Sequence, residues 1–196
     1  MISIAITGGI GSGKTYVSNM FQERGIPIYN ADTEAKRLMV QDEVIRKELV
    51  ALVGKEVYQG AELNKPLLAS YLFSSAEHVQ QINSIVHPRV KADFIEWLKA
   101  RQEYEVAGIE SAILFEAGFR DSVDSVIMVS APEELRLARA MKRDRATEQQ
   151  IRNRMSAQMN EDEKIKMADF VICNDETQPL NEQISFILQI LKTSKK

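Results

Sequence analysis

Short apolar runs alternate with longer amphipathic segments along the chain. The runs have the length and the β-branched or aromatic residues of buried strands: "ISIAI" (2–6), "PIY" (27–29), "EVAGI" (105–109), "SVIMV" (125–129) and "DFVIC" (169–173). Because helical patterns separate these runs, the alternation predicts a parallel sheet covered by helices on both faces. The predicted fold class is therefore α/β.

The last segment of the chain shows the clearest helical period, with Pro179 near its start. Its apolar residues recur every three or four positions: Leu180, Ile184, Ile187, Leu188 and Leu191. We expect this helix to cover one face of the sheet.

Two segments are longer than a simple α/β crossover requires. About 75 residues of mostly helical pattern separate the second and third strands, which predicts an inserted helical subdomain at 32–102. After the fourth strand, the pattern predicts two helices joined near "DRAT", with Thr147 as the N-cap of the second, and we expect this segment, 132–159, to form a lid. The remaining residues form the core of what we expect to be a single domain: 1–31, 103–131 and 160–196.

Composition restricts the possible functions. A chain of 196 residues with 44% hydrophobic and 27% charged residues is typical of a globular protein, and a net charge of −3 does not favour binding to nucleic acid or to a membrane surface. The single cysteine, Cys173, fits a reducing compartment, and its apolar surroundings predict a small buried residue. The N-terminus "MISIAIT" has no basic leader, and no apolar run approaches the ~20 residues of a membrane span. We expect a cytoplasmic protein.

The strongest motif is "GGIGSGKT", Gly8 to Thr15, which lies between a predicted strand and a helical pattern. Glycines let the backbone curl so that successive N–H groups point at phosphate oxygens, and the helix N-terminus adds partial positive charge. The alternative, a glycine-rich turn before Lys-Thr by chance, does not account for the strand and helix on either side. The motif predicts ATP and Mg²⁺ binding by these residues: Gly8, Gly9, Gly11, Ser12, Gly13, Lys14, Thr15 and the following Tyr16, with Thr15 at the metal.

Two absences favour a small kinase over other phosphate-loop proteins. The guanine-reading Asn-Lys-x-Asp motif of switch GTPases is missing, because Asn64-Lys65 continues with Pro-Leu. A mechanical ATPase normally has a longer apolar strand that ends in Asp, whereas the nearest equivalent here, "VAGIE", ends in Glu110. Small kinases tolerate this weaker form because substrate phosphates, the loop threonine and water hold most of their metal.

A basic segment follows the fourth strand. Residues 133–154 contain seven basic and four acidic side chains, and Arg136, Arg139 and Arg143 share one helix face. Phosphoryl transfer needs planar positive charge of this kind, so we expect Arg139 to reach the triphosphate, with Arg136 and Arg143 as second choices. The alternative is a solvated helix with ordinary ion pairs.

Asp32, in "IYNADTEAKR", follows a short apolar run at the start of a helical pattern. It is either a helix cap or a general base that accepts a proton from the acceptor of the phosphoryl group. The two histidines, His78 and His87, have no third ligand at metal spacing, so a structural or substrate-pocket role is favoured for each.

These features, read in chain order, resemble the dephospho-CoA kinases over about residues 2–190. The resemblance rests on the phosphate loop and on "NAD", "SIVHPRV", "AILFEAGF", "RLARAMKRD", "RNRMSAQ" and "ADFVICND". It implies the P-loop NTPase fold of the adenylate-kinase-like group, with a five-stranded parallel sheet flanked by helices, a helical CoA-binding insertion and a helical lid. The implied reaction is transfer of the ATP γ-phosphoryl group to the ribose 3′-hydroxyl of dephospho-CoA, giving CoA and ADP.

The resemblance also implies roles for individual residues. Lys14, Asp32 and Arg139 would be catalytic, with Asp32 as the base, and Asn174 would lie near the adenine. The acceptor side would be formed by Asp32, His87, Pro88 and Glu116. The partner is then the small-molecule substrate, and we expect a monomer or a weak homo-oligomer.

The chain departs from the family pattern at three positions. Asn30 replaces the first Asp of Asp-Ala-Asp, Ala112 replaces a Pro, and Arg136 replaces a Gln. Two other functions stay open on the residues alone: another small-molecule or nucleotide kinase of the same fold, and a nucleotide-binding regulatory module that phosphorylates nothing.

Overall fold

The computed structural model describes residues 1–193. The chain divides into two compact units: a core unit, formed by Met1–Tyr29 and the chain from Leu98 onward, and an insertion unit, Asn30–Trp97. No helix within the described residues is both long enough and apolar enough to cross a membrane.

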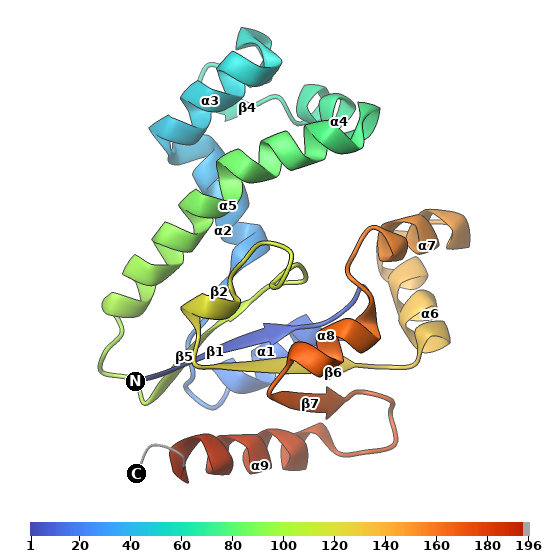
Figure 1. The fold of residues 1–196 in the computed structure, drawn as a ribbon. Helices are drawn as coiled ribbons and strands as arrows, with labels where there is room; N and C mark the ends of the chain where they lie inside the picture. Colours follow the sequence, from blue (N-terminus) through green and yellow to red (C-terminus); the bar gives the residue numbers. More distant parts are fainter. Residues whose placement is uncertain (194–196) are drawn as a thin grey trace. The chain divides into compact units, whose positions relative to one another are not determined.

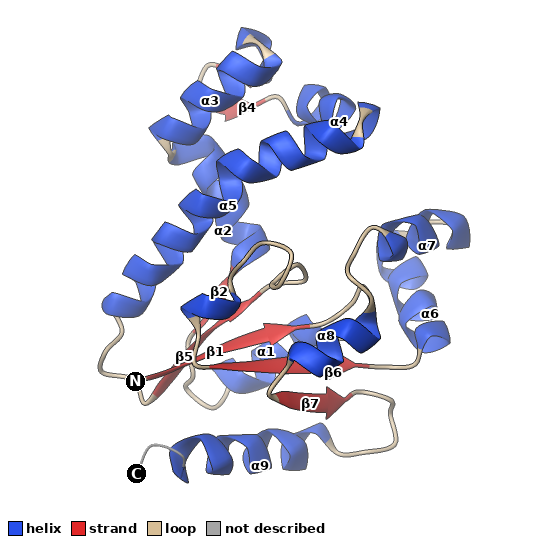
Figure 2. Cartoon of the chain, viewed as in Figure 1, coloured by secondary structure: helices blue, strands red, loops and turns tan. Residues whose placement is uncertain are grey.

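Within residues 1–193, five strands form one sheet in the order β2-β5-β1-β6-β7, and the pairs of β1 with β5, β1 with β6 and β6 with β7 are parallel (Figures 1 and 2). The strands are β1 (Ile2–Thr7), β2 (Ile28–Asn30), β5 (Val106–Glu110), β6 (Ser125–Ser130) and β7 (Phe170–Cys173). Each lies within one residue of a run predicted from the sequence, so the predicted α/β sheet is confirmed. The register pairs Ile6 of β1 with Glu110 of β5, which places the ends of these two strands together.

Helices cover both faces of the sheet in the core unit, and Figure 1 shows α1 behind the strands and α8 in front of them. The helices of this unit are α1 (Lys14–Gln22), α6 (Glu133–Asp144), α7 (Glu148–Ser156), α8 (Glu161–Met167) and α9 (Leu180–Thr193), with a short 3₁₀ turn, η2 (Arg120–Ser122). As predicted, α9 places its apolar side on the sheet: Ile184, Ile187 and Leu191 are buried in one cluster with β1 and α1 residues.

The two helices predicted around "DRAT" are α6 and α7. Thr147 caps α7 as predicted, and its side chain and that of Gln150 form a capping box. The two helices enclose a small cluster of their own around Leu137, Ala140 and Ile151, and Ile10 of the phosphate loop packs against it. The predicted lid segment therefore contacts the loop directly.

The insertion unit is mainly helical, as expected, but it also contains a short hairpin. Its elements are α2 (Ala31–Gln41), α3 (Glu43–Val53), η1 (Lys55–Val57), β3 (Tyr58–Gln59), β4 (Glu62–Leu63), α4 (Lys65–Ser74) and α5, which runs on into the core unit (Ala76–Lys99). The antiparallel β3–β4 pair was missed in the sequence because strands of two residues are too short to show alternation. An ion pair of 2.6 Å between Arg89 and Asp42 ties α5 to the start of α3.

Candidate active site

The phosphate loop joins β1 to α1 in a conformation that requires glycine at two positions. Gly11 and Gly13 have φ angles of 80° and 91°, in the left-handed region that L side chains rarely adopt. A Cβ atom on Gly11 would lie 2.1 Å from the Arg136 carbonyl oxygen, and one on Gly13 would lie 2.1 Å from Asn174 Nδ2. The loop is therefore packed tightly against α6 and against the segment that follows β7.

Helix α1 begins at Lys14 and has Gly13 as its N-cap, a residue with no side chain to accept the N–H groups of the first turn. Backbone N–H groups at the start of a helix attract anions because of both their hydrogen-bonding capacity and the helix dipole. The predicted strand–loop–helix arrangement is thus present in the fold.

Thr15 and Glu110 form the next part of the site. The Thr15 hydroxyl donates a 2.5 Å hydrogen bond to Glu110 Oε1, and the Glu110 residue is only 5% exposed. A hydroxyl and a carboxylate are hard oxygen ligands of the type that suits Mg²⁺. Glu110 was not among the predicted site residues. The available signal was an acid at the end of a buried strand, but its contact with Thr15 depends on the strand order.

Arg139 and Asn174, both predicted for the nucleotide, lie together beside the loop. Asn174 Nδ2 donates a 2.8 Å hydrogen bond to the Ser12 carbonyl. Arg139 donates to the Asn174 carbonyl at 3.0 Å and to the Glu176 carboxylate at 2.9 Å. The segment after β7 is therefore held between the phosphate loop and α6.

The three arginines of the α6 face have separate partners rather than a common one. Arg136 forms an ion pair of 2.7 Å with Glu161, whereas Arg143 pairs with its neighbour Asp144 at 2.7 Å. The Arg143 guanidinium and a second ion pair, from Arg154, lower the pKa of Asp144 well below its ordinary value. Arg143 and Arg154 therefore form ordinary ion pairs, as in the alternative interpretation of the basic segment.

A buried lysine connects α8 to the segment after β5. Lys164 is 1% exposed, and its Nζ lies 2.8 Å from Glu116 Oε1 and 2.8 Å from the Ala112 carbonyl oxygen. Glu116 Oε1 also accepts the Met159 N–H at 2.9 Å. Lys164 was not predicted as a site residue, because a lysine in a short charged helix is normally exposed.

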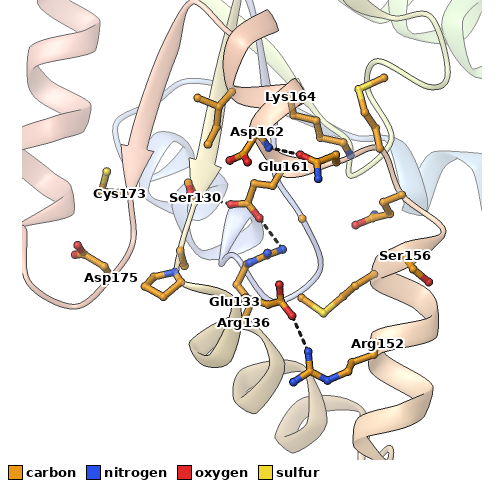
Figure 3. A pocket seen from close by; sticks show the side chains of 18 residues that line it. Ser130, Glu133, Arg136, Arg152, Ser156, Glu161, Asp162, Lys164, Cys173 and Asp175 are labelled. Carbon is orange, nitrogen blue, oxygen red and sulfur yellow. Dashed lines mark hydrogen bonds and ion pairs between the residues drawn. The ribbon is translucent and has the colours of Figure 1, made fainter.

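A cavity of about 830 Å³ lies between the end of β6, α6, α7 and α8 (Figure 3). Charged side chains of both signs line it, including Glu133, Arg136, Arg152, Glu161 and Lys164. Cys173 also lines the cavity and is half-buried, so the prediction of a buried cysteine was wrong. The apolar strand around Cys173 gave no sign of this, because the cavity wall comes from other elements.

In the insertion unit, Asn30 rather than Asp32 caps α2. The Asn30 side chain accepts the Thr33 N–H at 2.9 Å, while Asp32 is the exposed second residue of the helix. An acid in the first turn still interacts favourably with the helix dipole. One of the two open interpretations of Asp32 was that it caps this helix. Asn30, two residues earlier, has that role instead.

The two other predicted acceptor-side residues of this unit are adjacent in α5. His87 is half-buried, and desolvation lowers its pKa below the ordinary value, which favours the neutral imidazole. Pro88 is exposed within the helix, where it cannot donate a backbone hydrogen bond to the preceding turn.

Tyr16, predicted at the nucleotide, is 61% exposed on α1 of the core unit.

Comparison with known proteins gives the family. A family model described as dephospho-CoA kinase matches residues 2–179. The chain belongs to the dephospho-CoA kinase family. A relative named dephospho-CoA kinase from Bacteroides fragilis (strain YCH46) is 50% identical over 190 residues, which cover 97% of this chain and 93% of the relative.

Solved structures show the same fold. The crystal structure of a Thermus thermophilus protein matches with a TM-score of 0.83 at 32% identity and covers 96% of both chains. A dephospho-CoA kinase from Campylobacter jejuni matches with a TM-score of 0.72 at 22% identity and covers 98% of both chains. These matches confirm the fold that the resemblance implied, and the family model and the relative confirm the family.

The residues at the three departures from the dephospho-CoA kinase pattern make contacts, through the side chain at Asn30 and Arg136 but only through the backbone carbonyl at Ala112. Asn30 caps α2, the Ala112 carbonyl accepts from Lys164, and Arg136 pairs with Glu161. Nothing in the structure explains Ala112 in place of Pro, and none of the three replacements falls on Lys14, Thr15 or Asp32.

Proposed function

We propose that this chain transfers the γ-phosphoryl group of ATP to the ribose 3′-hydroxyl of dephospho-CoA, giving CoA and ADP in the last step of coenzyme A biosynthesis. The observation that carries the proposal is the dephospho-CoA kinase family match over residues 2–179. The phosphate loop has two glycines with positive φ and leads into a helix N-terminus without a side-chain cap. Such an arrangement provides the backbone N–H groups and the partial positive charge that a kinase needs to bind phosphates.

On the nucleotide side, the loop N–H groups and Lys14 would hold the phosphates, and Asn174 would lie near the adenine. Asn174 is already fixed to Ser12 of the loop, which supports this assignment. Arg139 would supply positive charge to the transferring group. Its present contacts with the Asn174 carbonyl and Glu176 keep it beside the loop, and a triphosphate competes with Glu176 for the guanidinium.

Thr15 and Glu110 are the residues that would hold Mg²⁺, Thr15 through its hydroxyl and Glu110 through its carboxylate. Their 2.5 Å contact, between the first turn of α1 and the end of β5, supports this pairing, since both are hard oxygen donors. When bound, the ion would neutralise charge on the phosphate oxygens.

On the acceptor side, Asp32 would act as the general base. The acceptor 3′-oxygen forms a bond to the γ-phosphorus while the bond to the β–γ bridging oxygen breaks, ADP leaves, and the hydroxyl proton passes to the Asp32 carboxylate. Asp32 is suited to this task because it is exposed and is not used as the cap of α2. His87, Pro88 and Glu116 would contact the acceptor, and the ion pair with Lys164 fixes the direction of the Glu116 carboxylate.

A panel of acceptors tests the proposal. The protein is mixed with ATP and Mg²⁺, and ADP release is measured with dephospho-CoA, nucleoside monophosphates, shikimate or no acceptor, in parallel with samples lacking Mg²⁺. We expect rapid ADP release only with dephospho-CoA and Mg²⁺. Faster release with shikimate or a nucleoside monophosphate would support another small-molecule kinase, and ATP binding without transfer to any acceptor would support a regulatory module.

A further inference from the structure

Two opposite charges from different helices meet beside the phosphate loop. Arg136 of α6 and Glu161, the first residue of α8, form an ion pair of 2.7 Å, and their side chains are only 11% and 16% exposed (Figure 3). The pair lies directly against the loop, because a Cβ atom built on Gly9 would be 2.4 Å from Arg136 Nη1 and 3.4 Å from Glu161 Oε2.

Glu161 is held in this place by a second contact. Its Oε1 atom accepts a 2.8 Å hydrogen bond from the Ser130 hydroxyl at the end of β6. A fixed, poorly solvated carboxylate beside the loop repels the phosphates that the loop binds, unless another charge compensates it.

Arg136 provides this compensation. Its backbone also supports the loop, since its carbonyl oxygen occupies the space that a side chain on Gly11 would need. The loop is also supported from the connection between α7 and α8, because the Gln158 side chain accepts the Ile10 N–H at 3.2 Å. The charged pair therefore lies where α6, the start of α8 and the phosphate loop meet.

We infer that Arg136 is a positioning residue of the nucleotide site, which neutralises the Glu161 carboxylate beside Gly9, and that it does not itself bind the triphosphate. The inference rests on the proposed use of ATP, but not on the identity of the acceptor. It differs from the sequence-based expectation, in which Arg136 was a second candidate to reach the triphosphate.

This role gives the two single substitutions opposite effects on ATP affinity. Arg136→Gln leaves a partly buried carboxylate uncompensated next to an anion site, so ATP binding weakens. Glu161→Gln leaves an uncompensated cation at the same place, so ATP binding stays equal or becomes tighter. A purely structural brace would weaken binding in both variants, because either substitution breaks the same contact.

The experiment compares Arg136→Gln, Glu161→Gln, the double variant and Arg120→Gln with the parent. Arg120 is a matched control, because it pairs with Asp169 at 3.2 Å near the start of β6 rather than at the phosphate loop. The Kd for ATP is measured by titration calorimetry without any acceptor, and the Tm and the KM for ATP are measured in parallel.

We expect the Kd of Arg136→Gln to rise roughly tenfold, the size expected for an uncompensated charge near the site. The Kd of Glu161→Gln should not rise, and the double variant should return to within about threefold of the parent, as should Arg120→Gln. The inference is overturned if the double variant binds ATP as weakly as Arg136→Gln, which would mean direct contact with the triphosphate, or if both single variants weaken binding equally. Failure of the parent to phosphorylate dephospho-CoA would contradict the proposed function and leave these Kd values interpretable.

Discussion

The predicted nucleotide residues and the predicted acceptor residues are held in different ways. In the core unit, the phosphate loop touches α6 through Gly11, and the Asn174 side chain reaches it from the segment after β7, while Thr15 is hydrogen-bonded to Glu110. In the insertion unit, Asp32 is an exposed residue in the first turn of α2, and Pro88 is exposed on α5.

The difference separates the residues proposed to bind ATP from those proposed to bind the acceptor. The phosphate loop and Asn174 are held by contacts from several elements of the core unit. Asp32 and Pro88 have the exposure that a bulky substrate needs for access, whereas His87 beside them is half-buried. Substitutions on the nucleotide side should therefore affect both binding and rate, whereas a substitution of the base should affect the rate alone.

The largest expected effect is that of Lys14→Ala. Loss of the ammonium group that we propose to contact the phosphates should lower turnover by roughly 10²–10³-fold or more. The free energy of unfolding should change by no more than about 1 kcal/mol, because this side chain supports no apolar core. Steady-state kinetics and urea unfolding check both points, with Lys192→Ala on α9 as the control, and near-normal turnover of Lys14→Ala would refute the phosphate-loop assignment.

The second effect concerns Asp32. Asp32→Asn keeps the shape of the side chain but cannot accept a proton, so kcat should fall at least about a hundredfold with normal thermal stability. The matched control is Asn30→Ala, which removes the cap of α2 and should cost ~1 kcal/mol of stability with much less effect on kcat. Turnover of Asp32→Asn within a few-fold of the parent would show that the base lies elsewhere.

A smaller effect separates Arg139 from its partner. Arg139→Ala should lower kcat at least about tenfold and change the KM for ATP less, if the guanidinium meets charge that develops in the transition state. Glu176→Gln removes the ion pair but keeps the arginine, so it should have little effect. Steady-state kinetics of the two variants at varied ATP concentration give kcat and the KM for ATP. A change in Arg139→Ala that is confined to the KM would mean that Arg139 is an ordinary binding residue.

The smallest effect is a pH dependence of stability from His87. Burial lowers its pKa in the folded protein, so below the unfolded value of ~6.5 the unfolded chain binds more protons. The stability contribution is fully present above about pH 6.5 and is lost as the pH falls through the folded pKa, at a rate of at most about 1.4 kcal/mol per pH unit. Urea unfolding at several pH values should show a shallower slope for His87→Gln, and an unchanged slope would contradict the assignment.

The sheet and the phosphate loop could be predicted because their signals are local. Each strand is a continuous apolar run, and the loop motif lies in one unbroken segment, Gly8 to Thr15. The pairing of Thr15 with Glu110 could not be predicted in this way. These residues are 95 positions apart, and only the strand order, which places β5 beside β1, brings them together.

The burial of the charged side chains beside the site also could not be predicted from the sequence. Arg136, Glu161 and Lys164 lie in segments that are rich in both signs of charge, where most side chains are solvated. Burial of these three depends on how α6 and α8 pack, which helical periodicity does not specify. The cap of α2 was ambiguous for another reason: Asn30 and Asp32 are both good capping residues, and the exact first residue of the helix decides between them.

The most direct test of the whole account is the identity of the product. The protein, ATP, Mg²⁺ and dephospho-CoA are incubated together, and the product is examined by mass spectrometry and by ³¹P–¹H correlation NMR. The account predicts one ADP for each new phosphate monoester, with the new phosphorus coupled to the ribose H3′ and the product identical to authentic CoA. ADP without phosphorylated acceptor, or a phosphate on any other hydroxyl, would contradict it.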